Sequence, residues 1–211
     1  LKTDGTLACW GWDFNSQSSP PAGRYNRRLM TAGASHTCQL QLDGRLACWG
    51  DNTYGQSSPP AGTFTEVAGG ALHTCGLKTD GTLACWGYNS DGQSLPPTGT
   101  FTQVAGGGYH TCGLRTDGTL ACWGSNAFGQ STPPAGTFAQ VAGGQYYTCG
   151  LNTDGTLACW GRNDFGQSMP PAGTFAQVAA GGGHTCGLKT EGAFVCWGDN
   201  SYGQGTPPSG T

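Results

Sequence analysis

Charged residues are scarce in this sequence: Asp, Glu, Lys and Arg make up 10% of its 211 residues, against about a quarter in an average protein. The net charge is −3, so the chain has no positive field with which to hold a polyanion. We therefore expect it to bind neither nucleic acid nor an anionic membrane surface. No apolar run approaches the roughly 20 residues that a membrane-spanning helix needs, so we also expect no membrane insertion.

Amphipathic helical periodicity is missing too. The chain contains 39 Gly and 12 Pro, and a Gly in a helix interior costs about 1 kcal/mol relative to Ala. The sequence has a repeat instead: Trp-Gly recurs with Trp at positions 10, 49, 86, 123, 160 and 197. The first interval is 39 residues and the other four are 37. Six copies of one unit therefore fill the chain.

Each unit has the pattern of three short strands. In the copy that begins at Phe64, the expected strands are residues 64–68, 74–78 and 82–86, and Thr79-Asp80-Gly81 joins the last two. Asp-Gly between two such runs is a strong hairpin signal. A period of about 37 residues with three or four strands is typical of a propeller blade. We predict an all-β fold: a β-propeller of six blades, forming one domain over residues 1–211.

The cysteine spacing agrees with this hairpin. If residues 79–81 form a three-residue loop, Lys78 faces Thr82, Leu77 faces Leu83, and Cys75 faces Cys85 in a non-hydrogen-bonded pair, where side chains approach most closely. Zinc ligation and free thiols are the two alternatives to a disulfide. Zinc sites favour a shorter C-x₂₋₄-C spacing than the one found here. We predict one hairpin disulfide per repeat, each with nine residues between its cysteines: Cys38–Cys48, Cys75–Cys85, Cys112–Cys122, Cys149–Cys159 and Cys186–Cys196.

Disulfides persist in an oxidising compartment, so we expect a secreted or surface-exposed protein. Cys9 has no partner in the chain, because the matching position would lie before Leu1. At the other end, Ser209-Gly210-Thr211 stop where another first strand would begin. We therefore expect the first and last blades to be incomplete.

Two elements of the unit resemble a known family. Trp86-Gly87-Tyr88-Asn89-Ser90-Asp91-Gly92-Gln93 and His73-Thr74-Cys75-Gly76-Leu77 resemble the repeats of the regulator of chromosome condensation superfamily. The short unit and its S-x-P-P tail are most similar to the secreted bacterial branch that includes the β-lactamase inhibitor protein II type. This resemblance covers all six units. It implies a propeller, usually seven-bladed, that acts by binding proteins, and in its sharpest form an inhibitor of an extracellular or periplasmic enzyme.

Strand alternation assigns the loops to faces. The Gly-Gly-x-x-His loop and the Trp-Gly-x-Asn-x-x-Gly-Gln loop share one face, and the Asp-Gly turns occupy the other. The turn face hardly varies between copies, whereas the loop face varies and is rich in aromatic residues, which are common anchors of protein interfaces. We predict that this face binds a partner through Trp12, Phe14, Tyr54, Leu72, Tyr88, Tyr109, Phe128, Tyr146, Tyr147, Arg162, Phe165 and Tyr202.

Other candidate residues have structural explanations. His36, His73, His110 and His184, with Tyr147 at the equivalent position, could suggest a ring of metal ligands. Equivalent positions on neighbouring blades lie on the order of 10 Å apart, however, while coordination needs about 2 Å. We expect these side chains to hydrogen-bond loop backbone instead. The sequence contains no recognisable catalytic set, so we predict no enzyme activity, no metal site and no cofactor.

Three hypotheses for function remain. The first is a protein-binding propeller, with an extracellular or periplasmic protein as the partner. The second is a lectin-like module, in which rings stack on sugars at repeated weak sites and multivalency supplies the avidity for a glycan. The third is a structural component of an extracellular surface or fibre.

Overall fold

The computed structural model describes residues 7–9, 13–23 and 25–207, with only the backbone for residues 25–28. In these ranges, fifteen strands form five three-stranded sheets, each in chain order, and no helix could cross a bilayer. The sheets are β1 (Tyr25–Ala32), β2 (His36–Gln41), β3 (Leu46–Gly50); β4 (Phe64–Gly69), β5 (His73–Lys78), β6 (Leu83–Gly87); β7 (Phe101–Gly106), β8 (His110–Arg115), β9 (Leu120–Gly124); β10 (Phe138–Gly143), β11 (Tyr147–Asn152), β12 (Leu157–Gly161); and β13 (Phe175–Ala180), β14 (His184–Lys189), β15 (Phe194–Gly198).

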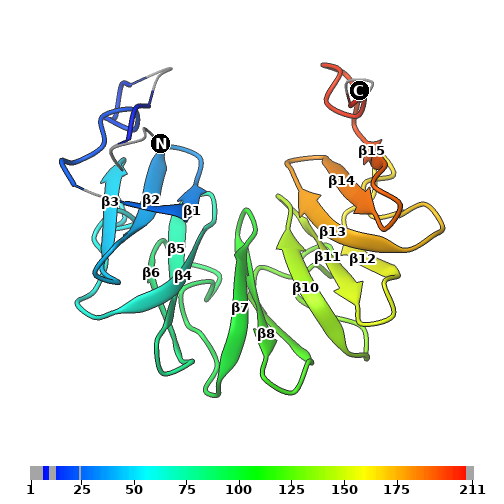
Figure 1. Ribbon diagram of the computed structural model, residues 1–211, viewed down its shortest axis with the longest axis horizontal. Coiled ribbons are helices and arrows are strands. Elements are labelled where there is room, and N and C mark those ends of the chain that lie inside the picture. The colour runs from blue at the N-terminus through cyan, green and yellow to red at the C-terminus, as the bar shows by residue number, and fades with distance from the viewer. Residues whose placement is uncertain (1–6, 10–12, 24, 208–211) are drawn as a thin grey trace.

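The five sheets follow one another around an open arc, and the first and last described loops, residues 13–23 and 199–207, lie on its open side (Figure 1). The loops that follow the first strands converge on the axis of this arc. A single hollow of about 320 Å³ is lined by all five of them: residues 32–34, 69–71, 106–108, 143–145 and 180–182. This radial arrangement of small antiparallel sheets is that of a β-propeller.

The predicted hairpin register is confirmed. Leu77 pairs with Leu83 and Cys75 with Cys85, and the Lys78 amide donates to the Thr82 carbonyl at 2.9 Å. Gly81 closes the turn with a φ of +82°, a left-handed conformation that an L-residue adopts at a cost. The expected strands end within one residue of β4, β5 and β6. Each first strand also carries a bulge, between Phe64 and Glu66 in β4, that the sequence did not predict.

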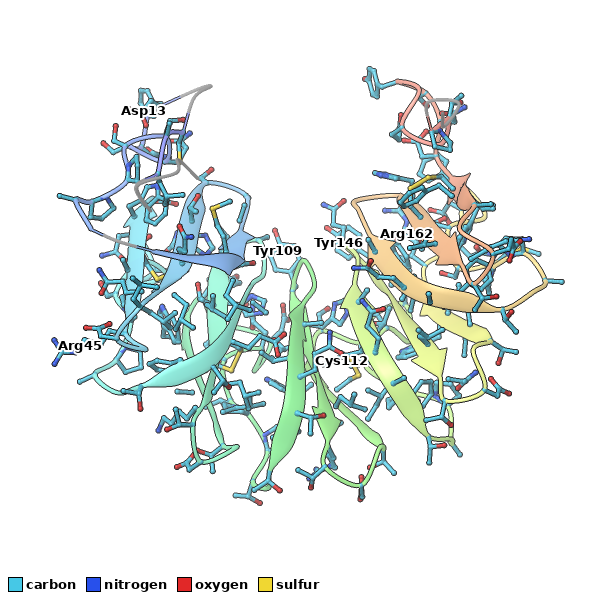
Figure 2. The ribbon with its side chains drawn as sticks, viewed as in Figure 1. Asp13, Arg45, Tyr109, Cys112, Tyr146 and Arg162 are labelled. Carbon is cyan, nitrogen blue, oxygen red and sulfur yellow. A yellow bond between two sulfur atoms is a disulfide. The ribbon has the colours of Figure 1, made fainter. Side chains whose placement is uncertain are left out.

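All five predicted disulfides are present, each between the second and third strands of one sheet. Figure 2 shows them as yellow bonds within the sheets, with Cys112 labelled. The Cα atoms of each pair are 4.0–4.1 Å apart, as in a non-hydrogen-bonded pair. Each bond closes a loop of about ten residues and contributes roughly 2–3 kcal/mol in the chain-entropy model.

Five of the six Trp-Gly copies form complete three-stranded sheets. In the first copy, the structure describes residues 7–9 and 13–23, and these contain no strand. Cys9 lies in this copy and forms no disulfide among the described residues.

Neighbouring sheets share an apolar core built around a disulfide. Cys75 and Leu77 of β5 pack against Phe101 and Val104 of β7, and Trp123 of the same following sheet joins them. The same cluster recurs at the next two junctions. Phe101 is 3% exposed, and burying a Phe side chain stabilises a fold by roughly 1.5–3 kcal/mol. Each sheet therefore depends on its neighbour for much of its core.

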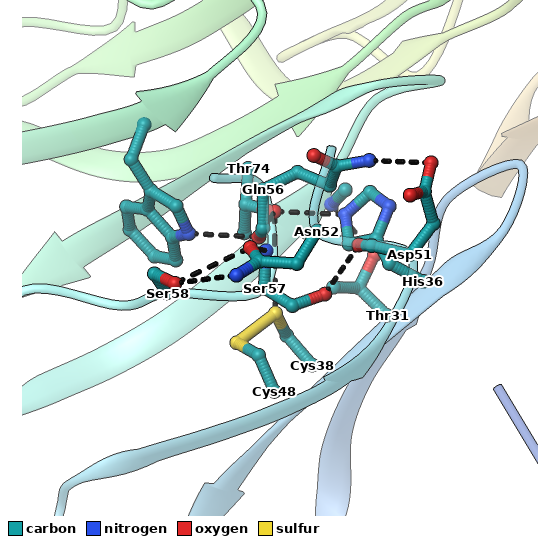
Figure 3. Close-up of a disulfide and its surroundings, with 12 residues drawn as sticks. Thr31, His36, Cys38, Cys48, Asp51, Asn52, Gln56, Ser57, Ser58 and Thr74 are labelled. Carbon is teal, nitrogen blue, oxygen red and sulfur yellow. Dashed lines mark hydrogen bonds between the residues drawn. A yellow bond between two sulfur atoms is a disulfide. The ribbon is translucent and has the colours of Figure 1, made fainter. Parts of the chain in front are cut away.

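A polar contact also joins neighbouring sheets. The imidazole Nε2 of His36 lies 2.8 Å from the Thr74 hydroxyl, which donates to the Gln56 carbonyl at 3.0 Å. The Trp86 indole donates to the same carbonyl at 2.9 Å. Figure 3 shows this group beside the Cys38–Cys48 disulfide. The contact recurs at His73 with Thr111 and at His110 with Thr148. These three histidines therefore bond to a threonine of the next sheet, and the prediction that they bond to loop backbone was wrong.

The geometry of this contact fixes the charge of the histidines. Because Thr74 donates its only hydroxyl proton to Gln56, it accepts from His36 Nε2–H, and the proton-free Nδ1 lies buried without a partner. A proton on Nδ1 would be buried without an acceptor. Burial accordingly lowers the pKa of His73 to about 3 and that of His110 to about 4, and it lowers the pKa of His36 as well.

Glu66 occupies a position that holds glutamine in three other sheets. Gln140 Oε1 accepts from the Val178 amide at 3.0 Å, and its Nε2 donates to the Val178 carbonyl at 2.9 Å. Gln103 contacts Val141 in the same way. A carboxylate accepts hydrogen bonds but cannot donate one. Glu66 can therefore reproduce only the bond in which the side chain accepts, and it accepts from the Val104 backbone. Burial raises the pKa of Glu66 to about 7, because only the protonated acid avoids burying a charge.

We expect the fold to lose stability in acid through the histidines. Their pKa in the folded protein lies below the value of about 6.5 in the unfolded chain, so unfolding takes up protons and stability falls as pH drops from 6.5 towards 4. His110→Tyr, which copies Tyr147, should lower the slope of unfolding free energy against pH by up to about 1.4 kcal/mol per pH unit. Urea denaturation between pH 6 and 4.5 measures this slope. The reverse variant Tyr147→His should raise it, and equal slopes in all three proteins would contradict the assignment.

Glu66 should have the opposite pH dependence. Its pKa in the folded protein lies above that in the unfolded chain, so its unfavourable contribution appears as pH rises through 4.5 and is complete above about 7. We expect Glu66→Gln to stabilise the protein at pH 8 by up to about 3 kcal/mol and to change little at pH 4.5. Urea midpoints at the two pH values test this. Gln103→Glu should destabilise the protein at pH 8, and a Glu66→Gln effect that is equal at both values would argue against a buried titrating carboxyl.

Candidate partner-binding surface

The loop after each third strand has a rigid frame. In the loop after β3, Asn52 Oδ1 accepts from the Ser57 amide, and Gln56 Oε1 accepts from the Tyr54 amide, both at 2.9 Å. Gly55 between them has a φ of +83°. The Asn and Gln bonds recur in the four later loops. The residue before the glycine, here Tyr54, is therefore held at the loop tip in every copy.

The first copy keeps this frame with different residues. Asp13 replaces the asparagine and accepts from the Ser18 amide at 2.6 Å, and Gln17 accepts from the Asn15 amide at 2.8 Å. Ser16 replaces the glycine and is the one described non-glycine residue with a positive φ, +59°. The absence of glycine from this loop therefore does not change its hydrogen bonds.

Five aromatic side chains form one continuous strip across four units. Tyr54 contacts Tyr88 with ring centroids 4.9 Å apart, and Tyr88 contacts Tyr109 at 6.3 Å. Tyr109 stacks on Tyr146 at 6.1 Å, and Phe128 contacts Tyr146 at 5.5 Å. We call these five residues the aromatic row. Because Tyr88 and Tyr109 come from the two different kinds of loop, both kinds lie on one face, as strand alternation predicts.

Arg162 ends the aromatic row. Its guanidinium lies 5.4 Å from the Phe128 ring centre and 5.7 Å from that of Tyr146, within the range of a cation–π contact. Its Nε is also 2.5 Å from Asp164. Figure 2 shows Tyr109, Tyr146 and Arg162 close together, far from Arg45, which follows an Asp-Gly turn. The structure therefore brings together six of the predicted binding residues.

The remaining predicted residues lie apart from this row or outside the described part of the chain. Phe14 and Tyr202 are 83% and 94% exposed at the two ends of the arc. Leu72 is half-buried. Phe165 lies beside Gly183, where an added Cβ would meet the Phe165 ring at 3.5 Å, an ordinary van der Waals distance. Trp12 lies outside the described residues.

Tyr147 does not belong to the surface, and its assignment as a binding residue was wrong. Its side chain is 0% exposed. The phenol donates to the His184 carbonyl and lies 2.9 Å from the Thr185 hydroxyl. Tyr147 therefore takes the place of histidine in the contact between sheets, and only its neighbour Tyr146 reaches the face.

The loop face carries more acid than base. Its two kinds of loop contain Arg162 and five described aspartates: Asp13, Asp51, Asp91, Asp164 and Asp199. Hydrogen bonds from the Thr53 hydroxyl and amide hold the pKa of Asp51 below its usual value, and those from Ser201 do the same for Asp199. Both therefore stay ionised at neutral pH. Among the residues that the structure describes, no three His, Cys, Asp or Glu side chains are grouped as a metal site would require.

Comparisons with solved structures agree with this architecture. The ectodomain of the receptor kinase CR4 from Physcomitrella patens is 31% identical, with a TM-score of 0.70; the alignment covers 81% of this chain and 49% of that one. The CRINKLY ectodomain of the receptor kinase ACR4 from Arabidopsis thaliana is 29% identical, with a TM-score of 0.71 and coverages of 91% and 69%. This chain thus spans about half the length of the Physcomitrella ectodomain.

More distant structures share the fold alone. Human WBSCR16 has a TM-score of 0.76 at 20% identity, over 90% of this chain and 70% of that one. No curated protein sequence matches the chain.

The repeat itself is shared with a described family. Residues 29–56, 64–93, 101–130, 138–167 and 175–204 match the regulator of chromosome condensation (RCC1) repeat. Each match begins in the first strand of a sheet and ends at the loop glutamine that orients the tip residue. Since the five segments span well over half of the chain and coincide with its five sheets, this chain belongs to the RCC1 repeat family.

Proposed function

We propose that this chain is a non-catalytic binding propeller, secreted or exposed on a cell surface, that holds a protein partner against the aromatic row. The observation that carries the proposal is the continuity of the row: five rings from neighbouring units contact one another along a face whose loops are held rigid. A preorganised surface loses little conformational entropy when a partner binds. Tyrosine is also among the residues that contribute most to protein interfaces.

The packing of the rings favours a protein over a glycan. A sugar ring stacks on an open aromatic face, and a lectin of this fold would present similar separate sites in each unit. Here Tyr88 meets Tyr54 edge to face, and Tyr109 is stacked on Tyr146. The faces are therefore partly covered by neighbouring rings, and the strip differs from unit to unit. One extended contact of about 800 Å², as in a standard protein interface, fits it better than repeated sugar sites.

The five disulfides support an extracellular or periplasmic location, because such bonds are rare in reducing compartments. The two plant neighbours are ectodomains of receptor kinases, which agrees with such a location. A more distant neighbour, yeast RCC1 at 20% identity, was solved bound to Kap60. These likenesses support a protein partner in general and name none for this chain.

The proposal is tested with variants of exposed row residues. Tyr54 and Phe128 are 49% and 48% exposed, so truncating both should leave the fold intact. We expect Tyr54→Ala/Phe128→Ala to weaken binding to a protein captured from a secreted-protein fraction by at least about 30-fold, measured by calorimetry. Tyr202→Ala, which removes an exposed ring outside the row, should bind as the parent does.

Two parallel measurements distinguish the alternatives. A glycan array probed with the same proteins should give no binding that depends on Tyr54 and Phe128, and competition by a free monosaccharide would refute the protein assignment. If the captured protein is an enzyme, a loss of its activity on binding would support the narrower prediction of an inhibitor. Equal binding by the parent and the double variant would exclude the aromatic row as the binding surface.

A further inference from the structure

The charged side chains of this protein are sorted by face. At the Asp-Gly turns and the strand ends beside them, both signs alternate: Asp43, Arg45, Lys78, Asp80, Arg115, Asp117, Asp154, Lys189 and Glu191. The loop face holds a single cation, Arg162, against its five described aspartates. Most of the excess negative charge among the described side chains therefore lies on the face that carries the aromatic row.

Ion pairs sharpen this difference between the faces. On the turn side, Arg45 Nε lies 3.8 Å from Asp43, and Lys189 Nζ lies 3.7 Å from Glu191. On the loop face, the ion pair between Arg162 and Asp164 occupies the one cation. Four loop-face aspartates belong to no ion pair among the described residues: Asp13, Asp51, Asp91 and Asp199.

Asp51 is held in place beside the aromatic row. The Gln56 Nε2 donates to Asp51 Oδ2 at 2.9 Å, and Oε1 of the same side chain accepts from the Tyr54 amide at 2.9 Å. The Thr53 amide and hydroxyl donate to Asp51 Oδ1 at 3.0 and 2.6 Å. One glutamine side chain thus fixes both the carboxylate and a ring of the row, so the charge has a defined position next to Tyr54.

Asp91 lies within the span of the row. It occupies the tip of its loop, where its amide donates to Gln93 Oε1 at 3.0 Å, as the tip amides of Tyr54 and Phe128 do in the loops before and after it. Because the loops follow one another around the arc, this exposed carboxylate comes between two tips that carry rings of the row. It is the one acidic tip among the five complete sheets.

Asp199 extends the acidic surface beyond the end of the row. The Ser201 amide and hydroxyl donate to Asp199 Oδ1 at 3.0 and 2.6 Å, so this carboxylate is also fixed within its loop. A Cβ added at Gly183 would lie 3.5 Å from Asp199 and 3.5 Å from the Phe165 ring. Asp199 and Phe165 therefore flank Gly183, and carboxylates accompany the rings from Tyr54 to the last loop.

We propose that the partner held against the aromatic row is a protein with a basic contact surface, whose lysine and arginine side chains pair with Asp51, Asp91 and Asp199. The inference rests on the proposed function, because the basic groups belong to the protein that the row binds. Apolar rings at the centre with charged groups around them are the usual arrangement of a protein interface. The carboxylates attract a basic partner during encounter and repel an acidic one, which adds specificity.

The charge preference can be tested before any partner is known. The probes are capped heptapeptides, acetyl-X-X-Gly-Trp-Gly-X-X-amide, with Lys, Gln or Glu at all four X positions. In ¹⁵N NMR titrations at low salt, we expect the Lys peptide to shift the amide resonances of residues 51–57 and 88–94 and to bind at least about tenfold more tightly than the Glu peptide. The Gln peptide should be intermediate. Raising the salt from about 20 mM to about 300 mM should shrink the difference, because exposed charges are then screened.

A matched pair of variants separates this surface from net charge. Asp91→Asn/Asp199→Asn removes two charges from the loop face and should weaken Lys-peptide binding about three- to tenfold. Asp80→Asn/Asp117→Asn removes two charges from the turn side and should change it by less than about twofold. Asparagine keeps the side-chain oxygen that accepts backbone hydrogen bonds at Asp199, Asp80 and Asp117. Equal losses in the two variants, equal binding of the Lys and Glu peptides, or no shift from the Lys peptide would overturn the proposal.

A captured partner then distinguishes this inference from the proposed function. Stopped-flow measurements should show that Asp91→Asn/Asp199→Asn slows association about three- to tenfold at low salt, whereas Tyr54→Ala/Phe128→Ala mainly speeds dissociation. A partner whose binding depends on the row, but whose association rate is unchanged by the Asp variants and by salt, would overturn the basic contact surface. The proposed function would stand in that case, because the rings would still carry the binding.

Discussion

The backbone carbonyl of the loop glutamine ties the surface of this protein to its core. Gln56 accepts from the Thr74 hydroxyl and the Trp86 indole, both of the following sheet, while its own side chain holds the amide of the tip residue Tyr54. One residue thus joins the next sheet to the loop that carries the exposed ring. Since the same bonds recur at Gln93, Gln130 and Gln167, the tips are positioned by the junctions between sheets. A rigid loop face follows from how the sheets dock.

The scarcity of charge is consistent with this construction. Both faces of an inner sheet pack against neighbours, so a charge placed there would be buried, and Glu66 shows the consequence in its raised pKa. The polar groups that join the sheets are neutral instead: histidine without its second proton, threonine, and glutamine. The disulfides compensate for small sheets of three strands, none of which buries enough apolar area to fold alone.

The sequence predicted what is encoded locally. The Asp80-Gly81 turn and the spacing of Cys75 and Cys85 fix one hairpin register, because both act within a dozen residues. The partner of His36 could not be found in this way, since Thr74 lies 38 residues on and meets it only when two sheets dock. Tyr146 and Tyr147 look alike as neighbours in sequence. The signal in the sequence that Tyr147 is buried is its position, which holds histidine in the other four complete units.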